Sequence, residues 1–213
     1  MPKLLKILLL ALALVAGKAV ATAQESDSLA LGEKQFALNT NPLSPYLRAI
    51  DWKPPEEASI WSSNWRGYIA HWTIEGGQLV LVDATIKVRL DSRKEETRSI
   101  KSTLFPGADR VVAEWYSGAL IVPDGERVQY VHMGYASRYD HYQVFRVAKG
   151  EVIEHLSLTG EQFEAYRSDK FEAFTRTQEF KDAYEEMRAD PDWDEESIMD
   201  FLRDFHSERY LSM

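Results

Sequence analysis

The chain has 213 residues, of which 25 are Lys or Arg and 34 are Asp or Glu, giving a formal net charge of −9. Hydrophobic residues make up 45%, enough for a packed core, so the composition excludes a chain that is disordered throughout. The lack of cysteine excludes disulfide bonds, Cys-ligated metal centres and a thiol nucleophile. The acidic balance argues against nucleic acid as a partner, because phosphate backbones are bound by basic surfaces.

Residues 1–23 have the features of an export signal peptide. Lys3 and Lys6 give a positive start, an unbroken apolar run covers residues 7–16, and residues 21–23 read Ala-Thr-Ala, which a signal peptidase accepts. The apolar run is shorter than the roughly 20 residues that span a bilayer, so we expect cleavage rather than a retained anchor. With no later apolar span, the sequence predicts no membrane-spanning segment after cleavage. The expected product is periplasmic or secreted and begins near Gln24.

Residues 24–60 are predicted to form an irregular N-terminal segment that packs on the body of the protein at least in part. Long helices and strands are blocked there by four prolines, since proline lacks an amide donor. These are Pro42, Pro45, Pro54 and Pro55.

Residues 61–158 have the pattern of an antiparallel β domain. Gly76-Gly77 separates the runs 66–75 and 78–90, and paired glycines favour a hairpin because they accept positive φ. Alternate apolar residues from Val80 to Leu90 predict one buried face, and a polar loop is expected to follow over 91–98. The remaining short β-like runs are too closely spaced for βαβ crossovers, which favours a meander; they cover 111–116, 119–122, 127–133, 142–148 and 152–158.

Residues 159–213 switch to helical spacing and form an acidic extension, with 16 acidic and 7 basic side chains over 161–213. Thr159 and Gln162 have the spacing of a capping box. Residues 190–192 separate two predicted amphipathic helices, the first of them broken near Asp169 or Thr175.

The fold class predicted from these patterns is α+β. It consists of an antiparallel β-sheet domain, curved or sandwich-like, with two amphipathic C-terminal helices. Because large apolar side chains left in water are costly, we expect the aromatic stripe of these helices to pack on the sheet or on each other.

Two motifs carry a resemblance to a known family. Residues 64–72 read N-W-R-G-Y-x-A-x-W, and residues 130–139 read Y-V-H-M-G-Y-x-S-x-Y. In this order they resemble a family of small bacterial proteins of unassigned function. The resemblance covers about residues 60–155. It implies an antiparallel β domain and adds no catalytic assignment.

Residues 130–142 are the segment richest in groups that suit ligand binding. Gly134 allows a turn, and Tyr rings and Arg guanidinium groups stack well on sugars, bases or other aromatics. The alternative, which we favour on general grounds, is a structural loop between ordinary packed strands. The candidate ligand-binding residues, with one taken from the first motif, are Arg66, His132, Tyr135, Arg138, Tyr139 and His141.

Arg66 has two interpretations. A guanidinium at this position suits a carboxylate or phosphate ligand, which it would bind with two parallel hydrogen bonds. The alternative, which we favour, is a structural ion pair with Glu114 across the sheet, or a stack on a ring.

Neither a metal site nor a cofactor is expected. A site could draw on four residues, but they show no spacing typical of metal ligands; they are His71, His132, His141 and Asp140. Ser117-Gly118 does not match a nucleophile elbow, so we assign no catalytic residue.

The leading functional hypothesis is an exported, non-catalytic binding or accessory protein of the bacterial envelope, whose partner is an unknown envelope component or exported protein. One alternative is a hydrolase acting on cell-wall or polysaccharide material through His132, His141 and an acid. Another is an inhibitor or immunity factor for a cationic envelope-active enzyme, which the acidic helices would attract electrostatically.

Overall fold

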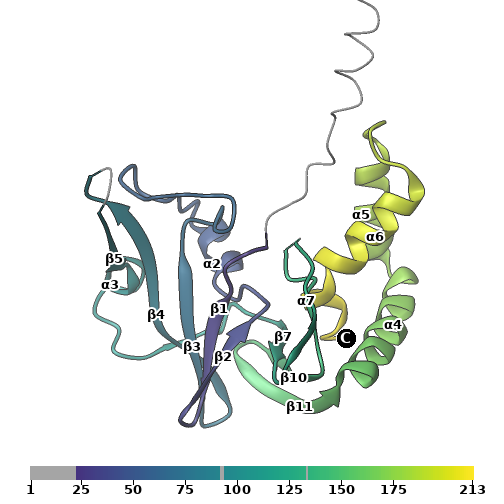
Figure 1. Cartoon of the computed structure of the whole chain (residues 1–213), viewed down its shortest axis with the longest axis horizontal. Coiled ribbons are helices and arrows are strands. Elements are labelled where there is room, and N and C mark those ends of the chain that lie inside the picture. Colours follow the sequence, from purple (N-terminus) through teal and green to yellow (C-terminus); the bar gives the residue numbers. More distant parts are fainter. Residues whose placement is uncertain (1–22, 92–93, 133) are drawn as a thin grey trace, which may run out of the picture.

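The computed structural model describes residues 23–213 apart from residues 92, 93 and 133, so the predicted export signal lies outside the described residues except for Ala23. Figure 1 shows an α+β protein in which a curved sheet occupies one side and helices occupy the other, as the sequence predicts. The sheet is mixed, with mostly antiparallel strands. No helix among the described residues is long and apolar enough to cross a membrane.

The first part of the sheet is built on the hairpin that Gly76-Gly77 predicts, and its neighbours extend the hairpin on both sides. The strand order is β2-β1-β3-β4, with β5 and β6 also paired to β4. β1 and β3 run parallel, whereas the other pairs are antiparallel. The strands are β1 (Asp27–Leu31), β2 (Lys34–Leu38), β3 (Ile69–Glu75), β4 (Gln78–Arg89), β5 (Glu95–Ser99) and β6 (Val111–Val112).

The second part of the sheet is an antiparallel group that joins β4 at the pair Gln78–Glu151. It contains β7 (Gly118–Pro123), β10 (His141–Ala148) and β11 (Glu151–Thr159), in the order β11-β10-β7. Two short strands, β8 (Arg127–Gln129) and β9 (Arg138–Tyr139), form a separate ribbon beside it.

Six helices are present in the described part of the chain. Two short ones lie within the sheet connections, α2 (Ser44–Ala49) and α3 (Lys101–Leu104). The C-terminal ones begin at the capping box of Thr159 and Gln162, which forms as predicted. They are α4 (Gly160–Thr175), α5 (Gln178–Arg188), α6 (Glu195–Phe205) and α7 (Ser207–Tyr210).

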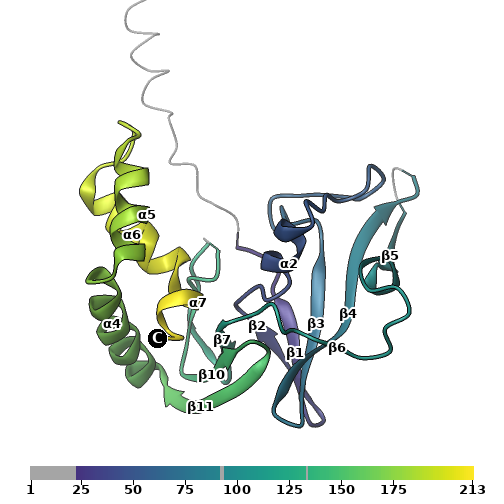
Figure 2. The ribbon, with the colours of Figure 1, turned by 180° about the vertical axis from the view of Figure 1, so that it is seen from behind.

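The strand pair β7–β10 has both of its faces buried. Leu120 and Phe145 point into a core shared with β1, β3 and β4. Ile121 and Val144 point the other way, into a core that holds the aromatic stripe of the C-terminal helices. Figure 2 shows the same arrangement from behind, with β7 and β10 between the first part of the sheet and the helices. The predicted packing of the helical stripe on the sheet is confirmed.

Several details of the prediction are wrong. The irregular segment 24–60 contains the hairpin β1–β2, because its prolines lie after residue 41 and leave the earlier residues free to pair. The polar loop 91–98 contains the start of β5. The strand pairs described within residues 61–158 are antiparallel as predicted, but β4 lies beside β11, so these strands do not form a simple meander; the parallel pair involves β1, which precedes this segment. The predicted break of the first C-terminal helix near Thr175 is confirmed, since α4 ends there and α5 begins at Gln178, whereas the short α7 was not predicted.

The buried face predicted over residues 80–90 is also wrong at two residues, Val82 and Leu90, of which Leu90 is 47% exposed just after the end of β4. Val82 is 49% exposed, while Leu79 and Leu81 are fully buried. The pairing with β3 skips Val82, which makes it the extra residue of a β-bulge. A bulge moves the following side chains to the other face, so the simple alternation holds only from Ala84 onward.

Two turn glycines make a matched test of the fold. Gly76 and Gly150 both have positive φ, at +59° and +82°. A methyl group on Gly76 would meet nothing within 4 Å, whereas one on Gly150 would lie 2.9 Å from the carbonyl carbon of Ala113. We expect Gly76→Ala to cost about 1–2 kcal/mol through backbone strain alone. Gly150→Ala should cost clearly more in urea denaturation, and equal losses would contradict this packing.

Candidate functional site

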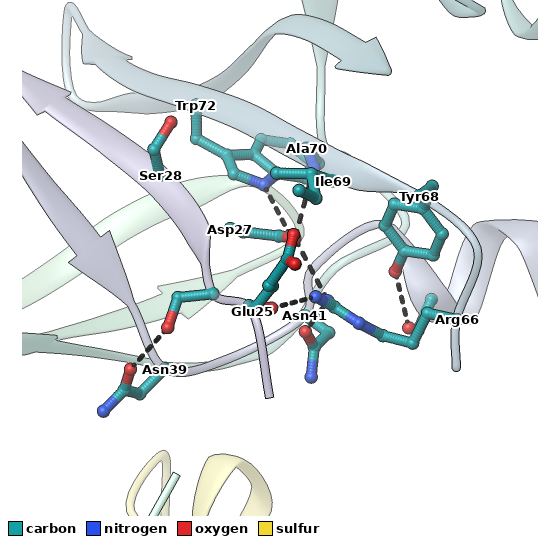
Figure 3. Close-up of polar contacts among 12 residues, drawn as sticks. Glu25, Asp27, Ser28, Asn39, Asn41, Arg66, Tyr68, Ile69, Ala70 and Trp72 are labelled. Atoms are coloured by element: carbon teal, nitrogen blue, oxygen red, sulfur yellow. Dashed lines mark hydrogen bonds and ion pairs between the residues drawn. The ribbon is translucent and has the colours of Figure 1, made fainter. Parts of the chain in front are cut away.

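A buried ion pair between Asp27 and Arg66 lies where the two parallel strands begin (Figure 3). Nη1 of Arg66 is 3.0 Å from Oδ1 of Asp27, and the two side chains are 4% and 0% exposed. Asp27 also accepts hydrogen bonds from the Ala70 amide at 3.1 Å and from Nε1 of Trp72 at 3.3 Å. Because β1 runs parallel to β3, the first residue of β1 lies beside the start of β3, where these donors are.

Both terminal nitrogens of Arg66 are occupied within the protein. Nη2 donates to the Glu25 carbonyl at 2.7 Å, Nη1 also donates to Oδ1 of Asn41, and the guanidinium lies 5.0 Å from the centre of the Tyr68 ring. A structural ion pair and stack at Arg66 is thus confirmed. The partner suggested from the sequence, Glu114, is wrong, because β6 ends at residue 112 and Glu114 is exposed in the turn that follows.

Asn41 connects this ion pair to the loop of the second motif. Its Oδ1 accepts from Arg66 and, at 3.0 Å, from the hydroxyl of Tyr135. An arginine can only donate, so Asn41 must turn its oxygen toward Arg66 and its amide nitrogen away, as Figure 3 shows. Burial raises the pKa of Tyr135, so its hydroxyl keeps its proton and remains a donor.

A cavity of about 170 Å³ lies next to this network, between the sheet, the loop 134–138 and the C-terminal helices. The sheet side of its wall includes Asn41 and Arg66. The helix side includes Glu164, Arg167 and Glu208. The cavity thus lies where segments from the start, the middle and the end of the sequence meet.

Glu208 joins the helix side to the sheet. Its Oε2 accepts a hydrogen bond from the backbone N–H of Asn41 at 3.2 Å, which links α7 to the chain just after β2. Burial raises the pKa of Glu208. Hydrogen bonds from the Asn41 backbone N–H and from the Tyr116 hydroxyl act in the opposite direction and lower this pKa by a smaller amount. Next to it, Arg167 forms an ion pair with Asp204.

Three of the six predicted ligand-binding residues line the cavity, namely Arg66, Tyr135 and Arg138. Arg66 and Tyr135 belong to the buried network, whereas Arg138 is exposed at the start of β9. Their common location joins the two sequence motifs at one site, since Arg66 comes from the first motif and the other two come from the second.

The other three predicted residues are not among those that line the cavity. His132 is exposed and its Nδ1 lies 2.6 Å from the Tyr130 hydroxyl. His141 is exposed and lies 3.3 Å from a carboxylate oxygen of Asp140. Tyr139 packs edge-on against Tyr142. Within the described ranges, no three His, Cys, Asp or Glu side chains gather in a geometry that would hold a metal ion.

Sequence patterns did not identify the residues that form the helix side of the cavity. Glu164, Arg167 and Glu208 lie in an acidic helical segment, where an isolated charge resembles any solvated helix residue. Only the spacing of Glu164 and Arg167, which are one helical turn apart, gave a local signal of pairing.

Comparisons of the chain with protein-family models, with curated protein sequences and with solved structures find no match. The cavity and its surrounding contacts are therefore the basis for a functional assignment.

Breaking the buried ion pair should destabilise the protein strongly. Asp27→Asn keeps the shape of the side chain but leaves the Arg66 charge buried without a counter-charge, so we expect a loss of about 3–5 kcal/mol in chemical denaturation. As a control, Glu57→Gln breaks an exposed pair with Arg98 and should cost at most about 1 kcal/mol. Similar losses of unfolding free energy in the two variants would show that the buried pair stabilises the fold no more than an exposed pair does.

Glu208 predicts a dependence of stability on pH. Because its folded pKa is raised, its contribution to stability is complete below the unfolded value of 4.5 and is lost as the pH rises through the folded pKa. Glu208→Gln stays neutral, so its melting temperature relative to the wild type should rise between pH 4.5 and pH 8. The exposed Glu172→Gln serves as the control. A constant difference between Glu208→Gln and wild type over this range would refute the prediction.

Proposed function

We propose that the protein is an exported, non-catalytic binding protein of the bacterial envelope and that the cavity holds its ligand or an extended part of its partner. The observation that supports this most is the junction of the two motifs. Trp65 and Arg66 from the first motif and residues 134–138 from the second line one cavity, although they are far apart in sequence. We likewise propose membership of the bacterial family that these motifs resemble.

The size of the cavity limits what it can bind. At about 170 Å³ it is smaller than the roughly 300–1,000 Å³ that pockets for drug-sized molecules provide. It therefore suits a single ring or one end of a longer molecule. Two large side chains in its wall are exposed, Trp65 at 68% and Phe205 at 53%, which offers apolar contact to the part of the ligand that remains outside.

Filling the cavity tests this proposal. Ala136 lines the cavity, so Ala136→Trp should occupy it and abolish co-sedimentation with purified cell-wall or outer-envelope fractions. Thr103→Trp adds the same bulk at an exposed position of α3 and should bind like the wild type. Both variants are first compared by thermal melting, so that only folded protein is scored. If Ala136→Trp is folded and still binds fully, the cavity is not the binding site.

Export makes a separate prediction. If residues 1–23 are a cleaved signal peptide, the protein expressed in a bacterium should be recovered outside the cytoplasm with an intact mass that begins at Gln24. Replacing Ala21 and Ala23 by Arg should block processing and leave the longer form. Cytoplasmic recovery of an unprocessed wild-type chain would exclude the proposed location.

A further inference from the structure

We propose that the cavity selects a sugar ring that carries a carboxylate, such as a hexuronic acid at the end or within a chain of an envelope polysaccharide. This inference rests on the proposed binding function and names the chemistry of its ligand. It combines the polarity of the two cavity walls, the exposed aromatic rings and one unpaired arginine.

The sheet side of the cavity presents hydrogen-bond donors. The oxygen of Asn41 is held by Arg66 and Tyr135, which leaves its amide nitrogen to face the cavity. Asn39 also lines the cavity, and its oxygen accepts from Ser26 at 3.0 Å. In Figure 3 the amide nitrogens of Asn39 and Asn41 both point away from the strands, to the side on which the C-terminal helices lie. This wall is therefore set to bind acceptor oxygens.

The helix side presents mainly hydrogen-bond acceptors. Glu164, Asp204 and Glu208 all contribute to this wall. A ligand that fits between the two walls must accept hydrogen bonds on one side and donate them on the other. The hydroxyl groups of a sugar ring do both, because each has one proton and two lone pairs.

Two aromatic rings provide surfaces for the apolar faces of a sugar ring. Trp65 is largely exposed, and Phe205 lies opposite the loop, 3.7 Å from where a side chain on Gly134 would begin. Phe205 is held in place by stacking on Phe201, with ring centres 4.5 Å apart. A ring held in this way binds with little loss of side-chain freedom.

Arg138 supplies the charge selectivity. The other two arginines in the wall are already paired, Arg66 with Asp27 and Arg167 with Asp204. In the described part of the chain the exposed guanidinium of Arg138 has no ion pair or hydrogen bond. An arginine binds a carboxylate with two parallel hydrogen bonds. The nearby acidic side chains favour a singly charged carboxylate over a doubly charged phosphate, because repulsion grows with ligand charge.

Calorimetric titration of the full mature protein with D-glucuronate, D-glucose and D-glucose 6-phosphate tests the inference. We expect the affinity for glucuronate to be at least about ten-fold higher than for the other two sugars. A difference of this size corresponds to one charge-assisted hydrogen bond. Arg138→Gln should lower glucuronate affinity to the level of glucose and leave glucose unchanged. Arg89→Gln, which removes an exposed charge at a residue that does not line the cavity, should bind like the wild type.

The possible outcomes separate the ligand class from the binding function. Equal affinity for glucose and glucuronate, or an Arg138→Gln variant with unchanged preference, would overturn the inference. So would tighter binding of the phosphate. If none of the three binds but envelope fractions still bind in a manner that Ala136→Trp abolishes, the sugar acid is wrong and the proposed function stands. Glucuronate binding that Ala136→Trp leaves unchanged would place the ligand elsewhere and overturn both.

Discussion

The ion pair between Asp27 and Arg66 is the constraint on which the candidate site depends. A charge without access to water must be matched by an opposite charge and by hydrogen bonds, and only the parallel alignment of β1 with β3 brings these groups together. Arg66 in turn orients Asn41, and Asn41 holds the hydroxyl of Tyr135. One buried charge thus positions residues from three distant segments. Arg66, Asn41 and Tyr135 also line the cavity, so the ion pair fixes this part of the cavity wall.

The second determinant of the site is the strand pair β7–β10, which serves two cores at once. One face completes the core beneath β1, β3 and β4, and the opposite face supports the C-terminal helices. The helices therefore stand at a fixed distance from the first part of the sheet, and the space left between them is the cavity. The continuous apolar run of β7 is explained by the same fact, since a strand buried on both faces has no polar side.

Local patterns allowed the sequence to predict part of this structure. Gly76-Gly77 predicted the central hairpin, and Thr159 with Gln162 predicted the start of α4, because turns and caps depend on neighbouring residues. The parallel pairing of Ser28 with His71 joins residues 43 positions apart, so no local sequence pattern predicts it. The candidate site was likewise predicted only in part. Clustered aromatic and basic residues in the sequence indicated the loop side of the cavity, whereas the helix side could be identified only from the structure.

The burial of Tyr210 and Leu211, both fully enclosed in the helical core, has a consequence for biosynthesis. A nascent chain that has not yet been translated through residue 211 leaves the helix-facing side of β7 and β10 uncovered, so its folding cannot finish while the ribosome is still adding these residues. Until then the incompletely folded polypeptide exposes apolar surface, which favours capture by holdase chaperones.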